Sequence, residues 1–242
     1  MTAKPETPTA PSSPRLCHGR VASVENITPD TRIVKVTLAE QASVPFRAGQ
    51  YAMLHAPGME PRAFSIASAP HLPYLEFHVK STGRGISRWI FDNWKPGADV
   101  ALEAPFGDHY WRPSSRPLLA LAGGVGIAPL KAIIEAHLDH PGDAPAHLYW
   151  GVRDEAHLYL DAFFRALKTR HPRFHYVPLI AQEGGAKHRT GFIGPAVAAD
   201  FSTLAGFTLY MAGPAAMVAA TLPQLLAHGA EKSFIFSDAF GP

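Results

Sequence analysis

Two short segments contain the side chains in this sequence that could do chemistry. The first, Arg62–Ser68, places a guanidinium, an aromatic ring and two hydroxyl groups along one extended stretch. The second, Gly123–Pro129, is a glycine turn that follows an apolar run and opens a helical pattern. The first segment suits a flavin, and the second suits the diphosphate of a nicotinamide dinucleotide, because the amide groups at a helix start bind anions.

Side-chain alternation decides what the first segment can present to a ligand. In an extended strand Arg62, Phe64 and Ile66 share one face, whereas Ser65 lies on the other. One strand can therefore offer a cation, a flat contact and a hydroxyl to different parts of a flavin. The structural alternative is an ordinary barrel strand with an exposed arginine and a core phenylalanine.

A second polar turn follows some twenty residues later. His78–Lys80 reads as a strand that passes through Gly83, Arg84 and Gly85 into a helix. The first amide groups of that helix lack intrahelical partners, so they can bind an anion beside the charge of Arg84. An ordinary capped helix would show the same pattern, but the position after Arg62 favours a flavin site.

The glycine fingerprint has a context that strengthens it. Leu118–Ala122 leads directly into Gly123–Gly126, and Pro129 stands where the third glycine of the usual pattern would be. Proline suits a first helical turn because its missing N–H is not needed there. Met211–Met217 repeats the order of strand, Gly-Pro turn and helix, and both turns belong at the carboxyl edge of a parallel sheet. Plain connections between strands and helices are the alternative for each.

Arg153 and Asp154 follow the next strand, at the position where a protein of this kind would contact the adenosine ribose of the dinucleotide. A carboxylate there favours a free 2′-hydroxyl, and an arginine favours a 2′-phosphate. Both residue types are present, so the choice between NADH and NADPH stays open.

Two kinds of sequence periodicity predict the strands and helices that position these segments. Short β-like stretches up to about Trp111, interrupted by one helix near Ile86–Trp94, predict a small antiparallel barrel. Strands that alternate with helices after Pro113 predict a parallel sheet with crossover connections, closed by a strand at Lys232–Phe236. The predicted parts are a disordered leader at 1–14, a flavin-binding β-barrel domain at 15–112 and a Rossmann-like α/β domain at 113–242.

Composition excludes several other classes of protein. The chain has 242 residues, 47% of them hydrophobic, a net charge of +2 and a single cysteine, Cys17. One cysteine excludes an internal disulfide and a cysteine-ligated iron–sulfur cluster. The mild charge predicts no nucleic-acid partner, and the absence of a long apolar stretch predicts no membrane span and a cytoplasmic protein. No metal site is expected.

The residues Arg62-Ala63-Phe64-Ser65 resemble the flavin motif of the ferredoxin–NADP reductase superfamily. Gly123–Pro129, Ala212-Gly213-Pro214 and Phe236–Phe240 resemble its nicotinamide half. Within the superfamily the chain is similar to NAD(P)H–flavin reductases and to reductase modules of bacterial oxygenases. Many members carry a cysteine where this chain has Ala212, so slower hydride transfer and altered positioning are both open here.

The resemblance implies roles for individual residues. Arg62 would bind the flavin phosphate, Phe64 would pack on the flavin, Ser65 would bond near N5, and Gly85–Ser87 would contact the diphosphate, which points to FAD. The implied catalytic residues are Ser65, Asp238 and Phe240, with Phe240 at the ring face that nicotinamide must reach. The predicted flavin-binding residues are Arg62, Ala63, Phe64, Ser65, His78, Val79, Lys80, Gly85, Ile86 and Ser87. The predicted nicotinamide-binding residues are Gly124, Val125, Gly126, Pro129, Arg153, Asp154, Ala212, Gly213, Pro214 and Met217.

The favoured function is an FAD-dependent NAD(P)H oxidoreductase that passes electrons to a separate iron–sulfur protein or oxygenase component. One alternative is an NAD(P)H:flavin reductase that releases reduced free flavin. Another is a non-catalytic flavin-binding electron-transfer subunit.

Overall fold

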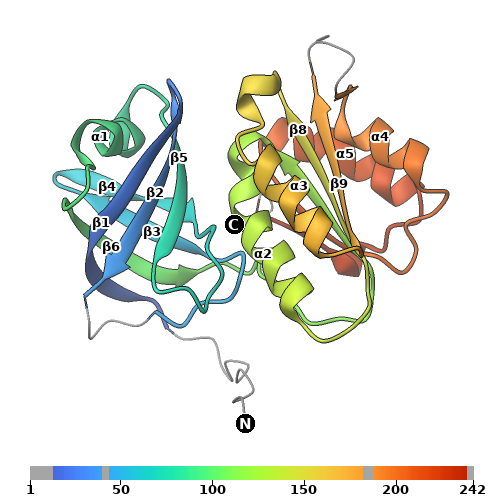
Figure 1. Cartoon of the computed structure of the whole chain (residues 1–242), viewed down its shortest axis with the longest axis horizontal. Coiled ribbons are helices and arrows are strands. Elements are labelled where there is room, and N and C mark those ends of the chain that lie inside the picture. The colour runs from blue at the N-terminus through green and yellow to red at the C-terminus, as the bar shows by residue number, and fades with distance from the viewer. Residues whose placement is uncertain (1–12, 40–43, 182–187, 239–242) are drawn as a thin grey trace.

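The computed structural model describes residues 13–39, 44–181 and 188–238 of the chain. Two groups of elements lie side by side in it (Figure 1). The first group is built on an antiparallel sheet and the second on a parallel sheet, as the two periodicities predict. Most of the predicted leader lies outside the described residues.

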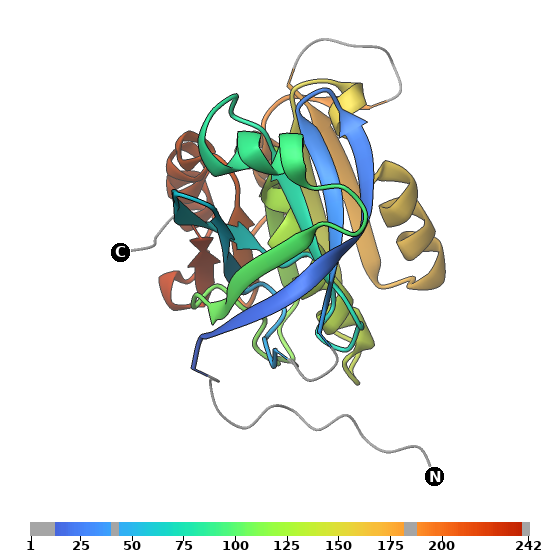
Figure 2. The same cartoon turned by 90° about the vertical axis from the view of Figure 1, so that its left-hand side faces the viewer.

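The first domain is a curved six-stranded sheet with strand order β4-β3-β6-β1-β2-β5. Its strands are β1 (Arg15–Thr28), β2 (Thr31–Leu38), β3 (Tyr51–Ala56), β4 (Met59–Ser65), β5 (Leu75–Lys80) and β6 (Asp99–Phe106). After the edge strand β4, the N–H of Ala67 donates to the carbonyl of Glu76 in the other edge strand at 2.8 Å. This bond brings the two edges together, so the sheet forms a half-barrel. Helix α1 (Gly85–Asn93) lies over one end of it (Figure 2).

The second domain is a parallel sheet with strand order β10-β9-β8-β7-β11-β12. The strands are β7 (Leu118–Gly123), β8 (Ala146–Val152), β9 (Phe174–Ile180), β10 (Arg189–Thr190), β11 (Thr208–Ala212) and β12 (Ile235–Ser237). Helices α2 (Ile127–Asp139) and α3 (Asp161–Arg170) cover one face, and α4 (Ile193–Asp200) and α5 (Ala215–Ala227) cover the other (Figure 1). Every residue of β7 is buried, because a central strand covered on both faces needs an apolar run.

Four elements differ from the sequence expectations. The sequence predicts the first strand at Val21–Val24, but β1 begins at Arg15 and is much longer. It predicts a helix from Leu158 to Lys168, but α3 begins at Asp161, after a short 3₁₀ turn at Glu155–His157. The closing segment is a 3₁₀ turn at Lys232–Phe234 followed by a short strand. The sequence analysis missed α4, whose Gly-Pro start suggests a break although proline fits a first helical turn.

The connection between the two sheets, residues 107–117, also joins the domains physically. The N–H of Arg112 donates to the hydroxyl of Tyr210 in β11 at 2.9 Å. On the first domain, Ile33 of β2 belongs to the apolar core that α2 and α3 form with their sheet. The two domains therefore share packing as well as a covalent link.

Candidate functional site

The segment Arg62–Ser65 forms the last part of the edge strand β4. Arg62 and Ala63 are exposed, Phe64 and Ser65 are half-buried, and Phe64 packs against the core of the first domain. Arg62 pairs with Leu54 in the sheet through its backbone, but its guanidinium makes no hydrogen bond or ion pair with any residue that the structure describes. An exposed guanidinium without a partner is available to a phosphate, which it can bind through two parallel hydrogen bonds.

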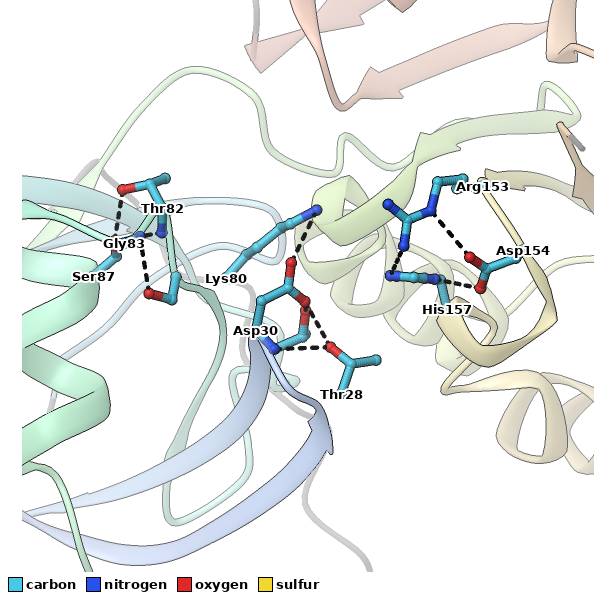
Figure 3. A network of polar contacts seen from close by, with 11 residues as sticks. Thr28, Asp30, Lys80, Thr82, Gly83, Ser87, Arg153, Asp154 and His157 are labelled. Atoms are coloured by element: carbon cyan, nitrogen blue, oxygen red, sulfur yellow. Dashed lines mark hydrogen bonds and ion pairs between the residues drawn. The ribbon is translucent and has the colours of Figure 1, made fainter.

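The turn before α1 has the form of an anion-binding loop. Gly83 and Gly85 have φ values of +77° and +60°, and a Cβ on either would meet open space. No side chain caps the start of α1, so its first amide groups are unused. The hydroxyl of Ser87 accepts a hydrogen bond from the Thr82 N–H at 3.1 Å and holds the turn closed (Figure 3). This geometry fits the diphosphate of FAD.

Several of the predicted flavin contacts have buried side chains. Val79 is fully buried, and Ile86 is 5% exposed within the core of the first domain. The ring of His78 lies between Glu76 and Tyr159, with a distance of 3.0 Å to each. His78, Val79 and Ile86 can therefore offer a ligand their backbone groups but not their side chains. Lys80 is exposed and pairs with Asp30 at 3.7 Å.

The two glycine turns of the second domain touch each other through their backbones. Strands β7 and β11 are neighbours, with Ala122 in register with Ala212. A Cβ on Gly126 would lie 2.3 Å from the carbonyl oxygen of Ala212. Gly213 has a φ of +145°, and a Cβ there would lie 2.9 Å from the backbone of Gly123. Only glycine allows this approach, so the two turns form one surface.

The remaining residues of these turns support that surface. The side chain of Met217 covers Gly123, since a Cβ at Gly123 would lie 2.5 Å from the methionine sulfur. Gly124 has a φ of +53°, and its carbonyl accepts a hydrogen bond from the Trp150 indole at 2.9 Å. Val125 is half-buried in the same turn, Pro214 stands before α5, and Pro129 is buried in the first turn of α2, as the sequence predicts.

Arg153 and Asp154 form a small charged group with His157 after β8. Asp154 accepts from His157 Nδ1 at 2.6 Å and from Arg153 Nε at 3.0 Å. The hydrogen bond from His157 and that from Arg153 lower the pKa of Asp154. This group faces Asp30 and Lys80 of the first domain (Figure 3). The arginine that would favour NADPH and the carboxylate that would favour NADH lie at the same place, so the geometry does not choose between the two donors.

The end of the described chain lies beside the second glycine turn. Ser237 of β12 is in register with Met211 of β11, one residue before Ala212. Phe236 stacks on Tyr210 with ring centroids 5.2 Å apart. Asp238 is exposed immediately after β12. Phe240 lies outside the described residues.

The sequence analysis missed a set of buried polar residues between the domains. Glu76, Lys131 and Tyr159 join His78 there, and both charged side chains are only 7% exposed. Their signal in the sequence is a charged residue inside an otherwise apolar run, Leu75–Val79 and Ile127–Ile134. Among the described residues, no group of three or more His, Cys, Asp or Glu side chains could hold a metal ion. Nor does the described part contain a helix that could cross a membrane.

Two family models match the two domains. An oxidoreductase FAD-binding domain matches residues 18–111, and an oxidoreductase NAD-binding domain matches residues 120–222. These matches and the two sites define an NAD(P)H-dependent FAD oxidoreductase. The chain belongs to the ferredoxin–NADP reductase superfamily.

Three relatives show how widely this arrangement is used. The chain is 31% identical over 230 residues to the NAD(P)H-flavin reductase of Aliivibrio fischeri, covering 91% of this chain and 97% of the relative. It is 32% identical over 234 residues to the ferredoxin–NAD(P)(+) reductase component of the naphthalene 1,2-dioxygenase system of Pseudomonas putida, covering 94% and 70%. The crystal structure of the Amycolatopsis cytochrome P450 reductase GcoB superposes with a TM-score of 0.87 at 32% identity, covering 95% and 71%.

Proposed function

We propose that this protein holds FAD in its first domain, takes hydride from NAD(P)H bound to the second, and passes electrons to a separate redox protein. The acceptor class we favour is an iron–sulfur protein or an oxygenase component. The observation that carries the proposal is that the first domain has both an exposed Arg62 guanidinium, without a partner among the described residues, and an open glycine turn before α1. Two anion-binding groups on one domain suit a flavin that stays bound.

The chemistry that FAD would supply when bound is acceptance of hydride at N5 and onward transfer of electrons to the acceptor. The chain contributes positioning. Arg62 and the turn Gly83–Ser87 would hold the phosphates, Phe64 would pack against the flavin, and Ser65 would donate to N5. Hydride transfer needs the two reacting rings about 3–3.5 Å apart, so correct placement is the main contribution that a protein can make.

The second domain would place the donor. The joined turns at Gly124–Gly126 and Ala212–Pro214 would bind the diphosphate, and Arg153 or Asp154 would contact the adenosine ribose. Asp238 would be a polar neighbour of the nicotinamide, and Phe240 would gate the ring face. We further propose domain limits of 15–112 and 113–242, a cytoplasmic location where NAD(P)H is available, and no nucleic-acid partner.

The composition of this sequence supports a separate acceptor. Its single cysteine cannot ligate an iron–sulfur cluster, so the residues of this sequence hold no such acceptor themselves. The relative from Pseudomonas putida is named as the ferredoxin–NAD(P)(+) reductase component of a naphthalene 1,2-dioxygenase system, which supports a protein acceptor. The Aliivibrio fischeri relative, covered over 97% of its length, favours a flavin reductase as the second candidate.

One experiment separates these functions. The purified protein is desalted, its visible spectrum is recorded, and NADH or NADPH is added without oxygen. Retained flavin that one donor bleaches rapidly supports the proposal. A colourless protein that oxidises the donor only with added flavin supports the flavin reductase, and retained flavin that neither donor bleaches supports a non-catalytic subunit.

A further inference from the structure

The two domains meet across a buried group of polar side chains, of which only His78 was predicted to belong to a cofactor site. We call Glu76, His78, Lys131, Glu135 and Tyr159 the interdomain cluster. Glu76 and His78 come from β5 of the first domain, and the other three come from α2 and the start of the α3 region in the second. Helix α2 lies on the side of the second domain that faces the first (Figure 1).

Lys131 makes the direct ionic contact between the domains. Its ammonium group lies 3.4 Å from Glu76 Oε1 and donates to the carbonyl of Ala67 at 3.3 Å. It also pairs with Glu135, one turn further along α2, at 3.2 Å. The side chains of Lys131 and Glu76 are each 7% exposed, so solvent screens this pair weakly.

The ionisation of the cluster fixes the direction of its hydrogen bonds. Burial opposes the charge of Glu76, but the hydrogen bond from His78 and the charge of Lys131 outweigh it and lower its pKa to about 2. Burial lowers the pKa of His78, so its ring is neutral. An ionised carboxylate only accepts, so His78 Nε2 donates to Glu76 and Nδ1 accepts from the Tyr159 hydroxyl.

A series of side-chain contacts also connects Tyr159 to the glycine turn at Gly124–Gly126, which would bind the nicotinamide donor. The Tyr159 ring packs edge-on against Trp150 with ring centroids 5.3 Å apart. The Trp150 indole donates to the carbonyl of Gly124 at 2.9 Å. His78 of the flavin domain is therefore connected through two aromatic side chains to the turn that would bind the donor.

Lys131 and its contact Ala67 lie near the two segments that would hold the reacting cofactors. Ala67 lies two residues after Ser65, the proposed partner of flavin N5. Lys131 lies about one helical turn after Gly126, whose turn would bind the donor. A buried ion pair adds little net stability compared with apolar residues of similar size, but it demands a definite geometry.

We propose that the Lys131–Glu76 contact is a positioning device that sets the orientation of the two domains and thereby the distance for hydride transfer. The inference rests on the proposed function. Lys131 touches neither cofactor in this assignment and acts through Ala67 and Glu76. Its loss should slow hydride transfer while each cofactor keeps its own binding groups.

Three variants of the full-length protein with its bound flavin test this. Lys131→Met removes the cation, and Glu76→Gln combined with Lys131→Met also avoids leaving a buried charge unpaired. Lys35→Met is the matched control, because Lys35 lies 3.9 Å from the other oxygen of Glu76 but belongs to the same domain. Residual dipolar couplings measure the relative orientation of the domains, and single-turnover reduction by saturating NADH or NADPH, whichever reduces the wild type faster, measures hydride transfer.

We expect both Lys131 variants to change the domain orientation and to slow flavin reduction roughly tenfold or more, with unchanged flavin content. Lys35→Met should match the wild type in both measurements. If Lys131→Met does not fold, the double variant decides. A wild-type orientation, or a wild-type reduction rate, in a folded Lys131 variant overturns the inference. A wild-type protein that neither NADH nor NADPH reduces refutes the proposed function instead, and the couplings still show whether Lys131 orients the domains.

Discussion

Gly126 and Ala212 approach each other closely across the two turns of the second domain, although they lie far apart in the sequence. A Cβ on Gly126 would lie 2.3 Å from the Ala212 carbonyl oxygen, which is closer than any real contact. The backbone of Gly126 is right-handed helical, with φ −61°. The need for glycine here is therefore one of space and not of backbone conformation.

Gly126→Ala should separate the two turns. We expect a loss of about 1–3 kcal/mol in unfolding free energy, since the backbone of β11 must move to admit the methyl group. The KM for the nicotinamide donor should rise roughly tenfold, because the shifted turn no longer matches the diphosphate. Denaturant unfolding and steady-state kinetics measure the two effects.

Gly97→Ala is a suitable control for this change. Gly97 has a φ of +90°, but a Cβ there would meet open space. It lies between α1 and β6 in the first domain, whereas both turns belong to the second. It should lose about 1 kcal/mol through backbone strain and keep the wild-type KM. Equal KM changes in the two variants would contradict the assignment of the Gly126 turn.

Arg62→Ala should weaken flavin binding and leave the protein fold intact. A charge-assisted hydrogen bond contributes about 1.5–3 kcal/mol, so flavin affinity should fall roughly tenfold to a hundredfold. The unfolding free energy of the flavin-free protein should not change, because Arg62 is exposed and has no partner among the described residues. Fluorescence titration with FAD measures the affinity. Arg88→Ala, which removes an exposed arginine paired with Asp92 on α1, should keep wild-type affinity.

Asp154→Ala should shift the donor preference toward NADPH. The carboxylate neutralises Arg153 at 3.0 Å and would repel a 2′-phosphate, so its removal frees the guanidinium for that group. The ratio of kcat/KM for NADPH to that for NADH should rise roughly tenfold. Asp161→Ala, whose carboxylate pairs with Arg165 on α3, should leave the ratio unchanged. An unchanged ratio in Asp154→Ala would show that the ribose binds elsewhere.

His109→Phe should remove part of the acid sensitivity of the fold. Burial, together with the charge of Arg112, lowers the pKa of His109 from 6.5 to about 4. Between those values the unfolded chain binds a proton that the folded chain does not, so stability is kept above pH 6.5 and lost as the pH falls. At pH 4 this amounts to about 3 kcal/mol. Phenylalanine can preserve the edge contact with Tyr210, so the variant should lose stability less steeply in denaturant unfolding between pH 7 and 4. Parallel pH profiles would refute this role.

Local patterns in the sequence were sufficient to predict individual strands, turns and helix starts. The buried run Leu118–Ala122, the turn before α1 and Pro129 in a first helical turn are decided by neighbours within a few residues. Helix α4 was missed because proline near a helix start resembles a break. The buried side chains of His78 and Val79 were not foreseen, because alternation along an edge strand does not reveal what covers it.

The sequence by itself determined the two kinds of sheet and the flavin and nicotinamide classes of ligand. These depend on residue types and on short-range periodicity along the chain. Only the tertiary structure decided that Gly126 touches Ala212 and that Lys131 contacts both Ala67 and Glu76. Such contacts join residues far apart in the chain, and they depend on strand order and domain packing, which no local pattern encodes.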